Sequence, residues 1–166
     1  FASLFQSVTT RTAGFNTISQ IGMTDASKLL SVILMFIGGS PAGTAGGVKT
    51  STVAVLVMVV VSLMRRHDDV EAFKKRISAN VLRKSLAIFF MALTALIIAV
   101  MIISTNEEGT VVGELGFLNQ LFEATSAIGT VGLSSGVTGS ASSITLIVLI
   151  VLMFLGRVGL LMVLFA

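Results

Sequence analysis

The chain has 166 residues, of which 54% are hydrophobic and 11% are charged, and its formal net charge is +3. Because soluble domains carry about 25% charged residues, this composition excludes an ordinary soluble domain and indicates a membrane protein. The sequence has no cysteine, which excludes thiolate metal sites and thiol redox chemistry in this chain.

The first expected elements are a short helix over residues 1–10 and an extended loop that contains Thr12, Ala13, Gly14 and Phe15. Glycine can take positive φ, so backbone carbonyl groups can approach one another here without a Cβ clash, and the threonine adds a hydroxyl oxygen. A dehydrated alkali cation needs such oxygens in place of its hydration shell. This loop is therefore a candidate cation-binding segment.

The stretch from 24 to 63 is too long to cross a bilayer as one straight helix. At this length a helix would extend about 60 Å, twice the thickness of the hydrocarbon core. Residues 38–47, here called the glycine-rich loop, contain five glycines and the only proline of the chain, and both residue types weaken helix interiors. The sequence therefore predicts a helix that is capped by Thr24 or Asp25 and breaks at this loop.

The glycine-rich loop has three interpretations. The spacing of Gly39, Gly43 and Gly47 fits close helix packing through small residues, although the proline and the glycine density disfavour a continuous helix. A similarity to phosphate-binding loops fails because Val48 replaces the glycine that must precede the lysine. The third interpretation is a flexible segment that lies in a pore.

A basic segment follows between positions 65 and 84. It holds seven of the eleven Lys and Arg residues, and the positive-inside rule makes it cytoplasmic. Since these charges adjoin hydrophobic spans, they favour a topology signal over nucleic-acid binding. We expect an amphipathic helix around residues 70–81 and a surface position for His67. The seven basic residues are Arg65, Arg66, Lys74, Lys75, Arg76, Arg83 and Lys84.

The second half of the chain contains an outward span, a short helix and an inward span. Residues 85–104 carry no charge over the roughly 20 residues that a spanning helix requires. Residues 117–128 are expected to form a helix too short to span, and residues 142–166 carry one charge, Arg157. Between these two helices lies a second candidate loop, and we call the two loops the filter segments. The second one comprises Thr130, Val131, Gly132 and Leu133.

Matching spacings indicate an internal repeat. The two Thr-x-Gly segments are offset by 118 residues, and the same offset relates residues 35–38 (Met-Phe-Ile-Gly) to residues 153–156 (Met-Phe-Leu-Gly). Residues 4–6 (Leu-Phe-Gln) match residues 121–123 (Leu-Phe-Glu) at an offset of 117. One copy must therefore have gained or lost one residue, relative to the other copy, between its short helix and its filter segment.

Charged residues in or beside the spans indicate a path for ions. At the centre of a lipid-facing helix Arg157 would cost about 2.5–3.5 kcal/mol, so we expect it to face a wet interior. It follows Gly156, the repeat mate of Gly38, and we expect it to meet the glycine-rich loop and raise the barrier for cations. Acidic residues either concentrate cations at a pore mouth or are solvated, and one of them, Glu123, has a third interpretation as an anchor of its short helix. These residues are Asp25, Glu107, Glu108, Glu114 and Glu123.

Residues 5–17, the glycine-rich loop and residues 122–134 resemble the Trk/Ktr/HKT superfamily of potassium transporters, and the resemblance covers essentially the whole chain. It implies an all-α membrane protein in which four helix–pore-loop–helix repeats surround one pore with four-fold pseudosymmetry. It also implies a portion of a longer protein, without the first two repeats. The implied divisions are a third repeat lacking its first helix (1–64), a basic cytoplasmic connector (65–84) and the fourth repeat (85–166).

The resemblance further implies potassium uptake through a gated, channel-like pore. Backbone carbonyls of both filter segments would bind potassium as the transported ligand, and no covalent cofactor is implied. Family members with serine at a filter glycine tend to admit sodium, so Gly14 and Gly132 favour potassium. The implied gate consists of Gly38, Gly39, Gly43, Gly46, Gly47 and Arg157.

The resemblance also implies partners and a location. The implied protein is a homodimer that crosses the bacterial inner (plasma) membrane several times and contacts lipid. A cytosolic, KtrA-like ring of nucleotide-binding regulatory subunits would move its gate, and the basic connector is a candidate contact for that ring. No nucleic acid is implied as a partner.

Two other functions compete with a potassium pore. A cation-coupled secondary transporter would also contain a broken helix around a midplane site, but two filter-like loops behind short helices fit it less well. An intramembrane enzyme would need a nucleophile–base pair or a metal cluster. The only histidine lies in the connector and no acidic pair lies within a span, so we expect no enzymatic activity.

Overall fold

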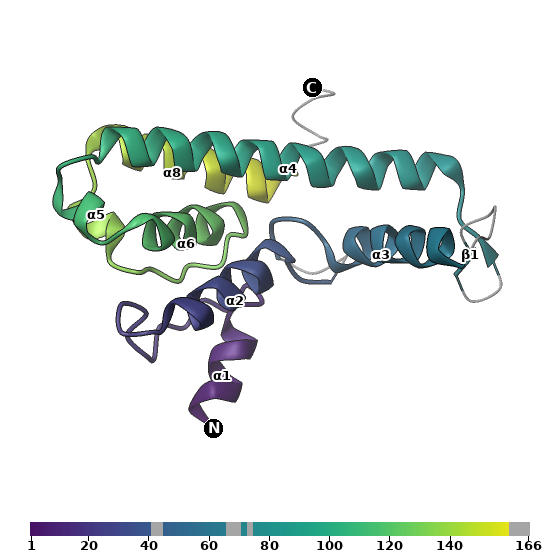
Figure 1. The fold of residues 1–166 in the computed structure, drawn as a ribbon, viewed down its shortest axis with the longest axis horizontal. Coiled ribbons are helices and arrows are strands. Elements are labelled where there is room, and N and C mark those ends of the chain that lie inside the picture. Colours follow the sequence, from purple (N-terminus) through teal and green to yellow (C-terminus); the bar gives the residue numbers. More distant parts are fainter. Residues whose placement is uncertain (41–44, 66–70, 73–74, 160–166) are drawn as a thin grey trace.

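A computed structural model describes residues 1–40, 45–65, 71–72 and 75–159 (Figure 1). Within these ranges the regular secondary structure is helical apart from one antiparallel pair of two-residue strands. The helices are α1 (Ala2–Thr9), α2 (Asp25–Phe36), α3 (Thr50–Met64), α4 (Ala79–Asn106), α5 (Val111–Glu114), α6 (Phe117–Ile128), α7 (Val137–Ser140) and α8 (Ser143–Val158). The strands are β1 (Glu71–Ala72) and β2 (Lys75–Arg76).

The hairpin overturns one expectation for the basic connector. The amphipathic helix expected around residues 70–81 is wrong, because β1 pairs with β2 and α4 begins only at Ala79, after an extended Ser78. Of the basic residues, Lys75 and Arg76 lie in β2, while Arg83 and Lys84 lie inside α4, ahead of its uncharged run. His67 and Lys74 lie outside the described residues.

The predicted break in the long apolar stretch is confirmed. Helix α2 ends at Phe36 and α3 begins at Thr50, so the glycine-rich loop separates two helices rather than bending one. Thr24 caps α2, since its side chain accepts a hydrogen bond from the backbone N–H of Ser27. Residues 41–44 of the loop, which include Gly43, lie outside the described residues.

Helix α4 is the long apolar element of the fold. It has 28 residues and extends about 42 Å. It is the one helix of the described residues that is long and apolar enough to cross a membrane, while α3 and α8 are shorter apolar helices. This helical, apolar architecture is compatible with a membrane protein.

Helix α6 lies at the centre of the fold. Helices α4 and α8 pack side by side on one side of it, and α2 packs against it from the other (Figure 1). Nine of its twelve residues are buried, so this helix is enclosed by protein although it is too short to span. A hydrophobic cluster that includes Leu96, Ile128 and Leu149 joins α4, α6 and α8. A second cluster joins α2 and α6 to the second filter segment through Val32, Phe122 and residues 131 and 133.

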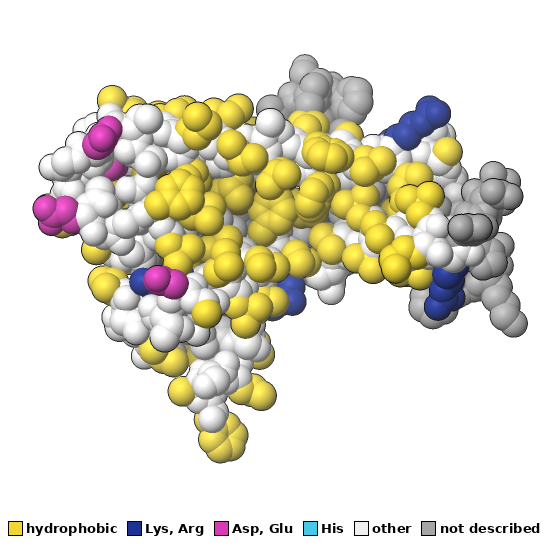
Figure 2. Space-filling model, viewed as in Figure 1, with side chains coloured by type: hydrophobic (Ala, Val, Ile, Leu, Met, Phe, Trp, Pro, Cys, Tyr) yellow, Lys and Arg dark blue, Asp and Glu magenta, His cyan; other side chains and the backbone are white. Residues whose placement is uncertain are grey.

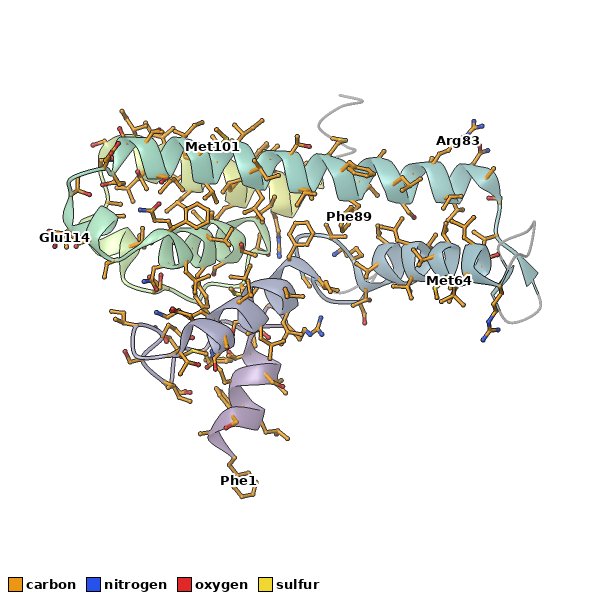
Figure 3. All side chains as sticks on the ribbon, viewed as in Figure 1. Phe1, Met64, Arg83, Phe89, Met101 and Glu114 are labelled. Atoms are coloured by element: carbon orange, nitrogen blue, oxygen red, sulfur yellow. The ribbon has the colours of Figure 1, made fainter. Side chains whose placement is uncertain are left out.

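The surface separates apolar from charged side chains. Figure 2 shows hydrophobic side chains across the middle of the visible face, acidic ones near the α5 end, and basic ones near the α3 and β1 end, with a few charged side chains along the lower edge between them. Figure 3 places Glu114 and Arg83 at these opposite ends. Large apolar side chains such as Ile98 on α4 and Ile147 on α8 are more than half exposed. An apolar band between charged ends is a pattern compatible with a bilayer.

A buried carboxylate joins the end of α4 to the start of α8. Glu107, which follows α4, is fully buried and accepts hydrogen bonds from the Ser142 backbone N–H (2.8 Å), the Thr145 hydroxyl (2.6 Å) and the Thr110 hydroxyl (2.8 Å). The Thr145 hydrogen bond is the largest cause of a lowered pKa of Glu107, about 2 instead of 4.5. The interpretation of Glu107 as a solvated surface acid is therefore wrong, and its interpretation as a pore-mouth charge stays a prediction.

The lowered pKa predicts how acid affects this junction. Above pH 4.5 the carboxylate stabilises the fold, and this stabilisation is lost as the pH falls through 4.5 toward 2. Glu107→Gln should lower the thermal unfolding midpoint at pH 7, and the difference from wild type should shrink at pH 3. The exposed neighbour Glu108 supplies the control, Glu108→Gln. A Glu107→Gln midpoint equal to wild type at pH 7 would contradict this role.

Candidate cation-binding site

The two filter segments lie against each other, although 118 residues separate them in the sequence. A Cβ atom built on Gly14 would lie 2.0 Å from the carbonyl oxygen of Val131 and 3.5 Å from the Cα of Gly132. No side chain fits at position 14, so only glycine permits this approach. The contact brings together one segment from each half of the chain.

The same unusual backbone conformation occurs in both filter segments. Thr12 (φ 67°) and Thr130 (φ 49°) are the non-glycine residues with positive φ in the described part of the chain, and Gly14 (72°) and Gly132 (92°) are also positive. A left-handed threonine costs of order 1–3 kcal/mol, and such strain is concentrated at functional sites. Since positive and negative φ alternate along each segment, we expect its carbonyl groups to point to one side and its N–H groups to the other.

Each short helix holds its filter segment through its own last turn. The Ala13 N–H donates to the carbonyl of Thr9 (3.1 Å), and the Val131 N–H donates to the carbonyl of Ser126 (2.9 Å). The first bond spans four residues and the second spans five. The Thr9 carbonyl also accepts from the Gly14 N–H (3.1 Å), a bond that spans five residues, so the one-residue difference between the two copies stays a prediction. The Thr9 hydroxyl also accepts from the Phe15 N–H (2.8 Å).

Buried polar side chains tie each short helix to the chain beyond its filter segment. Glu123, 5% exposed, accepts from the hydroxyls of Ser134 (2.9 Å) and Thr138 and from the Ser135 N–H (2.9 Å). Its interpretation as an anchor of its helix is therefore correct. In the first repeat the matching residue, Gln6, donates from Nε2 to Gln20 Oε1 (2.7 Å).

Gln6 was not recognised from the sequence. Two signals pointed to it: its alignment with Glu123 at the 117-residue offset, and its position as a polar residue in a short apolar helix. The distant partner Gln20 gave no local signal.

Replacing this anchor should destabilise the second filter segment. In the wild type, donors contact both carboxylate oxygens of Glu123. In Glu123→Gln an amide NH₂ group replaces one of these oxygens, and each buried donor left unpaired costs about 1–3 kcal/mol. We therefore expect a lower thermal unfolding midpoint. Glu114→Gln, at an exposed acid of the same stretch, is the matched control. Equal midpoints for the two variants would contradict the anchor role.

The glycine-rich loop contacts both the second filter segment and α8. The Gly46 N–H donates to the Thr130 hydroxyl (3.1 Å), and the Gly47 N–H donates to the Gly156 carbonyl (3.2 Å). At the base of the loop, the Gly38 N–H donates to Val48 O (2.8 Å). The carbonyl of Gly39 accepts from the Thr50 N–H (3.2 Å). Of the expected gate glycines, Gly43 is the one that lies outside the described residues.

Arg157 lies beside this contact. It directly follows Gly156, and its exposed side chain lines a cavity of about 750 Å³ together with Thr130, Gly132 and Glu123. The arginine thus shares one cavity with residues of the second filter segment. In the first segment the Thr12 hydroxyl oxygen is buried and has no hydrogen-bond partner among the described residues, so its lone pairs are available to a ligand.

The family relationship rests on the whole chain. The TrkH family, described as cation transport proteins, matches residues 1–166. The chain belongs to this family. The membership agrees with the resemblance to the Trk/Ktr/HKT superfamily that residues 5–17 and 122–134 indicate.

Curated relatives of this TrkH-family chain are named as ion uptake proteins. The Enterococcus hirae potassium/sodium uptake protein NtpJ is 37% identical over 99% of this chain and 36% of its own length. The Bacillus subtilis Ktr system potassium uptake proteins D and B are 36% and 34% identical, over 99% and 100% of this chain and 35% and 36% of their own lengths. The chain thus spans about a third of the length of these relatives. Their names describe transporters, which fits a protein that is not an enzyme.

Proposed function

We propose that this chain forms part of a potassium uptake protein and contributes two of the four segments of a backbone-carbonyl selectivity filter. One observation carries the proposal: two Thr-x-Gly segments from different repeats share the same left-handed backbone and meet at Gly14 and Gly132. Oxygen-lined, unwound backbone inside a membrane protein is tolerated where it lines a watery path. The names of the relatives support potassium as the ion.

The proposed architecture has four pore-loop repeats. Residues 1–64 form the third repeat without its first helix, 65–84 form the cytoplasmic connector, and 85–166 form the fourth repeat. The relatives are almost three times as long as this chain, which leaves room for two more repeats. The filter residues are Thr12, Ala13, Gly14, Phe15, Thr130, Val131, Gly132 and Leu133.

The proposed gate lies next to the second filter segment. Through their hydrogen bonds, Gly46 and Gly47 hold the C-terminal end of the glycine-rich loop beside Thr130 and Gly156. A loop in this position narrows the path of an ion that leaves the filter, and the positive charge of Arg157 opposes a cation in the adjoining cavity. The gate thus combines a steric barrier with an electrostatic one.

The proposed assembly follows from the Ktr names of two relatives. We expect a homodimer that crosses the bacterial inner membrane several times and binds a cytosolic ring of nucleotide-binding subunits through the connector. Charge reversal at Lys74, Lys75 and Arg76 should weaken binding of that regulator by at least about tenfold, since three favourable charge pairs would become repulsive. Unchanged binding in a pull-down titration would remove the connector as the contact.

Flux measurements on the full-length protein in liposomes test the function. A pore predicts potassium flux that follows the potassium gradient alone and a reversal potential fixed by the permeant ions. The broken helix α2–α3 also favours a second candidate, a cation-coupled transporter with its site at the break. Coupled transport predicts a reversal potential that shifts with the gradient of a second ion at constant potassium. That shift would reject the pore.

A further inference from the structure

Arg11 makes a long-range contact that neither the filter nor the gate explains. It lies between α1 and the first filter segment, and its Nη1 donates to the carbonyl oxygen of Ile37 at 2.8 Å. Ile37 is where α2 ends, with a backbone (φ −81°, ψ 84°) that is no longer helical. The last carbonyls of a helix lack intrahelical donors and carry partial negative charge. A guanidinium from another element therefore caps α2.

Ile37, whose carbonyl is capped, also lies immediately before the glycine-rich loop. Ile37 forms a bridge with Val48, and the Gly38 N–H donates to the Val48 carbonyl (2.8 Å). The two ends of the loop are thus held side by side. Fixing Ile37 therefore fixes the point from which the loop departs.

The two ends of the loop are attached by bonds of different strength. The Arg11–Ile37 bond is charge-assisted, and such bonds are roughly twice as strong as neutral ones. At the other end the bonds from Gly46 to Thr130 and from Gly47 to Gly156 join neutral groups at 3.1 and 3.2 Å. The Arg11 bond is exposed and adds to the bridge between Ile37 and Val48. The bonds of Gly46 and Gly47 are the ones that must break when the loop leaves Thr130 and Gly156.

The second repeat has no counterpart of this cap. At the 118-residue offset Gly129 stands in the place of Arg11. Its backbone lies against the same last turn of α2, since a Cβ built on it would lie 2.8 Å from the Met35 carbonyl. The end of α2 is thus held between the ends of both short helices, but only the first repeat supplies a charge.

We propose that Arg11 is a positioning residue that holds the hinge of the glycine-rich loop at Ile37. It thereby connects the first filter segment to the gate, and this inference rests on the proposed function of the loop as the gate. Losing the cap lets the loop leave its position beside Thr130 and Gly156.

The test combines accessibility with flux in the full-length protein. Ala45 is half-buried and directly precedes Gly46, so Ala45→Cys, in a background without other cysteines, reports release of the loop through its rate of thiol labelling from the cytoplasmic side. Arg11→Gln should raise the labelling rate and the regulator-independent potassium flux by at least about fivefold, the scale of one lost charge-assisted hydrogen bond. Arg11→Lys keeps the charge and should give a smaller increase. Thr105→Ala, at an exposed hydroxyl that donates within its own helix α4, is the control and should change neither.

The possible outcomes distinguish the role of Arg11 at the hinge from the role of the glycine-rich loop as the gate. Faster labelling without greater flux supports the hinge and rejects the loop as the gate. Unchanged labelling in Arg11→Gln and Arg11→Lys, with greater flux in Arg157→Ala, overturns the hinge and leaves the gate standing. Altered K⁺/Na⁺ selectivity with unchanged labelling also overturns the hinge, because Arg11 would then act on the filter alone.

Discussion

Gly132→Ser is expected to reduce the K⁺/Na⁺ permeability ratio of the full-length protein by about tenfold or more, equivalent to at least ~1.4 kcal/mol of lost discrimination. Gly132 has a φ of +92°, which side chains rarely tolerate, yet a Cβ built there meets nothing closer than the Cα of Gly14 at 3.9 Å. A serine therefore fits in space but strains the backbone. The strain should turn the neighbouring carbonyl groups away from the positions that replace water around potassium.

The contrast with other glycines makes this experiment specific. At Gly14 a Cβ would lie 2.0 Å from Val131 O, so Gly14→Ser should impair folding and cannot report selectivity alone. Gly139→Ser is the matched control, since its Cβ would meet nothing within 4 Å and its φ is not in the strained range. Bi-ionic reversal potentials provide the measurement. Wild-type selectivity in Gly132→Ser would remove this residue from the filter.

Arg157→Ala is expected to increase potassium flux by about tenfold or more when the regulator is absent. Two unit charges about 8 Å apart repel by about 2 kcal/mol at an effective dielectric constant of 20. Removing the arginine from the cavity that it shares with Thr130 and Gly132 should lower the barrier for a cation by a comparable amount. Shortening the glycine-rich loop should act in the same direction by widening the path.

The charge and the volume of Arg157 can be separated with one more variant. Arg157→Lys keeps the charge and should leave flux within about twofold of wild type if the barrier is electrostatic. Liposome flux assays at equal protein density compare the three proteins. Flux that is the same in Arg157→Ala and wild type would reject the gate.

Local patterns were sufficient to predict the helices that frame the site. The predicted short helix 117–128 coincides with α6, and the glycine-rich loop breaks the long apolar stretch because its composition opposes a helix. The repeat offset also aligned the two filter segments before their contact was visible. Each of these inferences needed only residues that are close in sequence or related by one spacing.

What the sequence did not predict depends on distant partners. Glu107 looks like a surface acid in an external turn, and its burial requires Ser142 and Thr145 from another helix. The interaction of Arg11 with Ile37 crosses 26 residues. The hairpin at β1 and β2 replaced an expected helix because strand pairing competes with a weak helical preference in a highly charged segment.

The packing of α2 makes the two repeats depend on each other. Helix α2 belongs to the first repeat but packs along α6 of the second, while a cavity of about 290 Å³ lies between α2 and its own short helix, lined by Gln6, Leu30 and Leu34. Helix α2 thus forms a wall around α6, whereas α8 packs on the α6 of its own half. A substitution on the inner face of α2 therefore changes the surroundings of the second filter segment as well as those of the first. The two halves of the chain cannot be engineered independently.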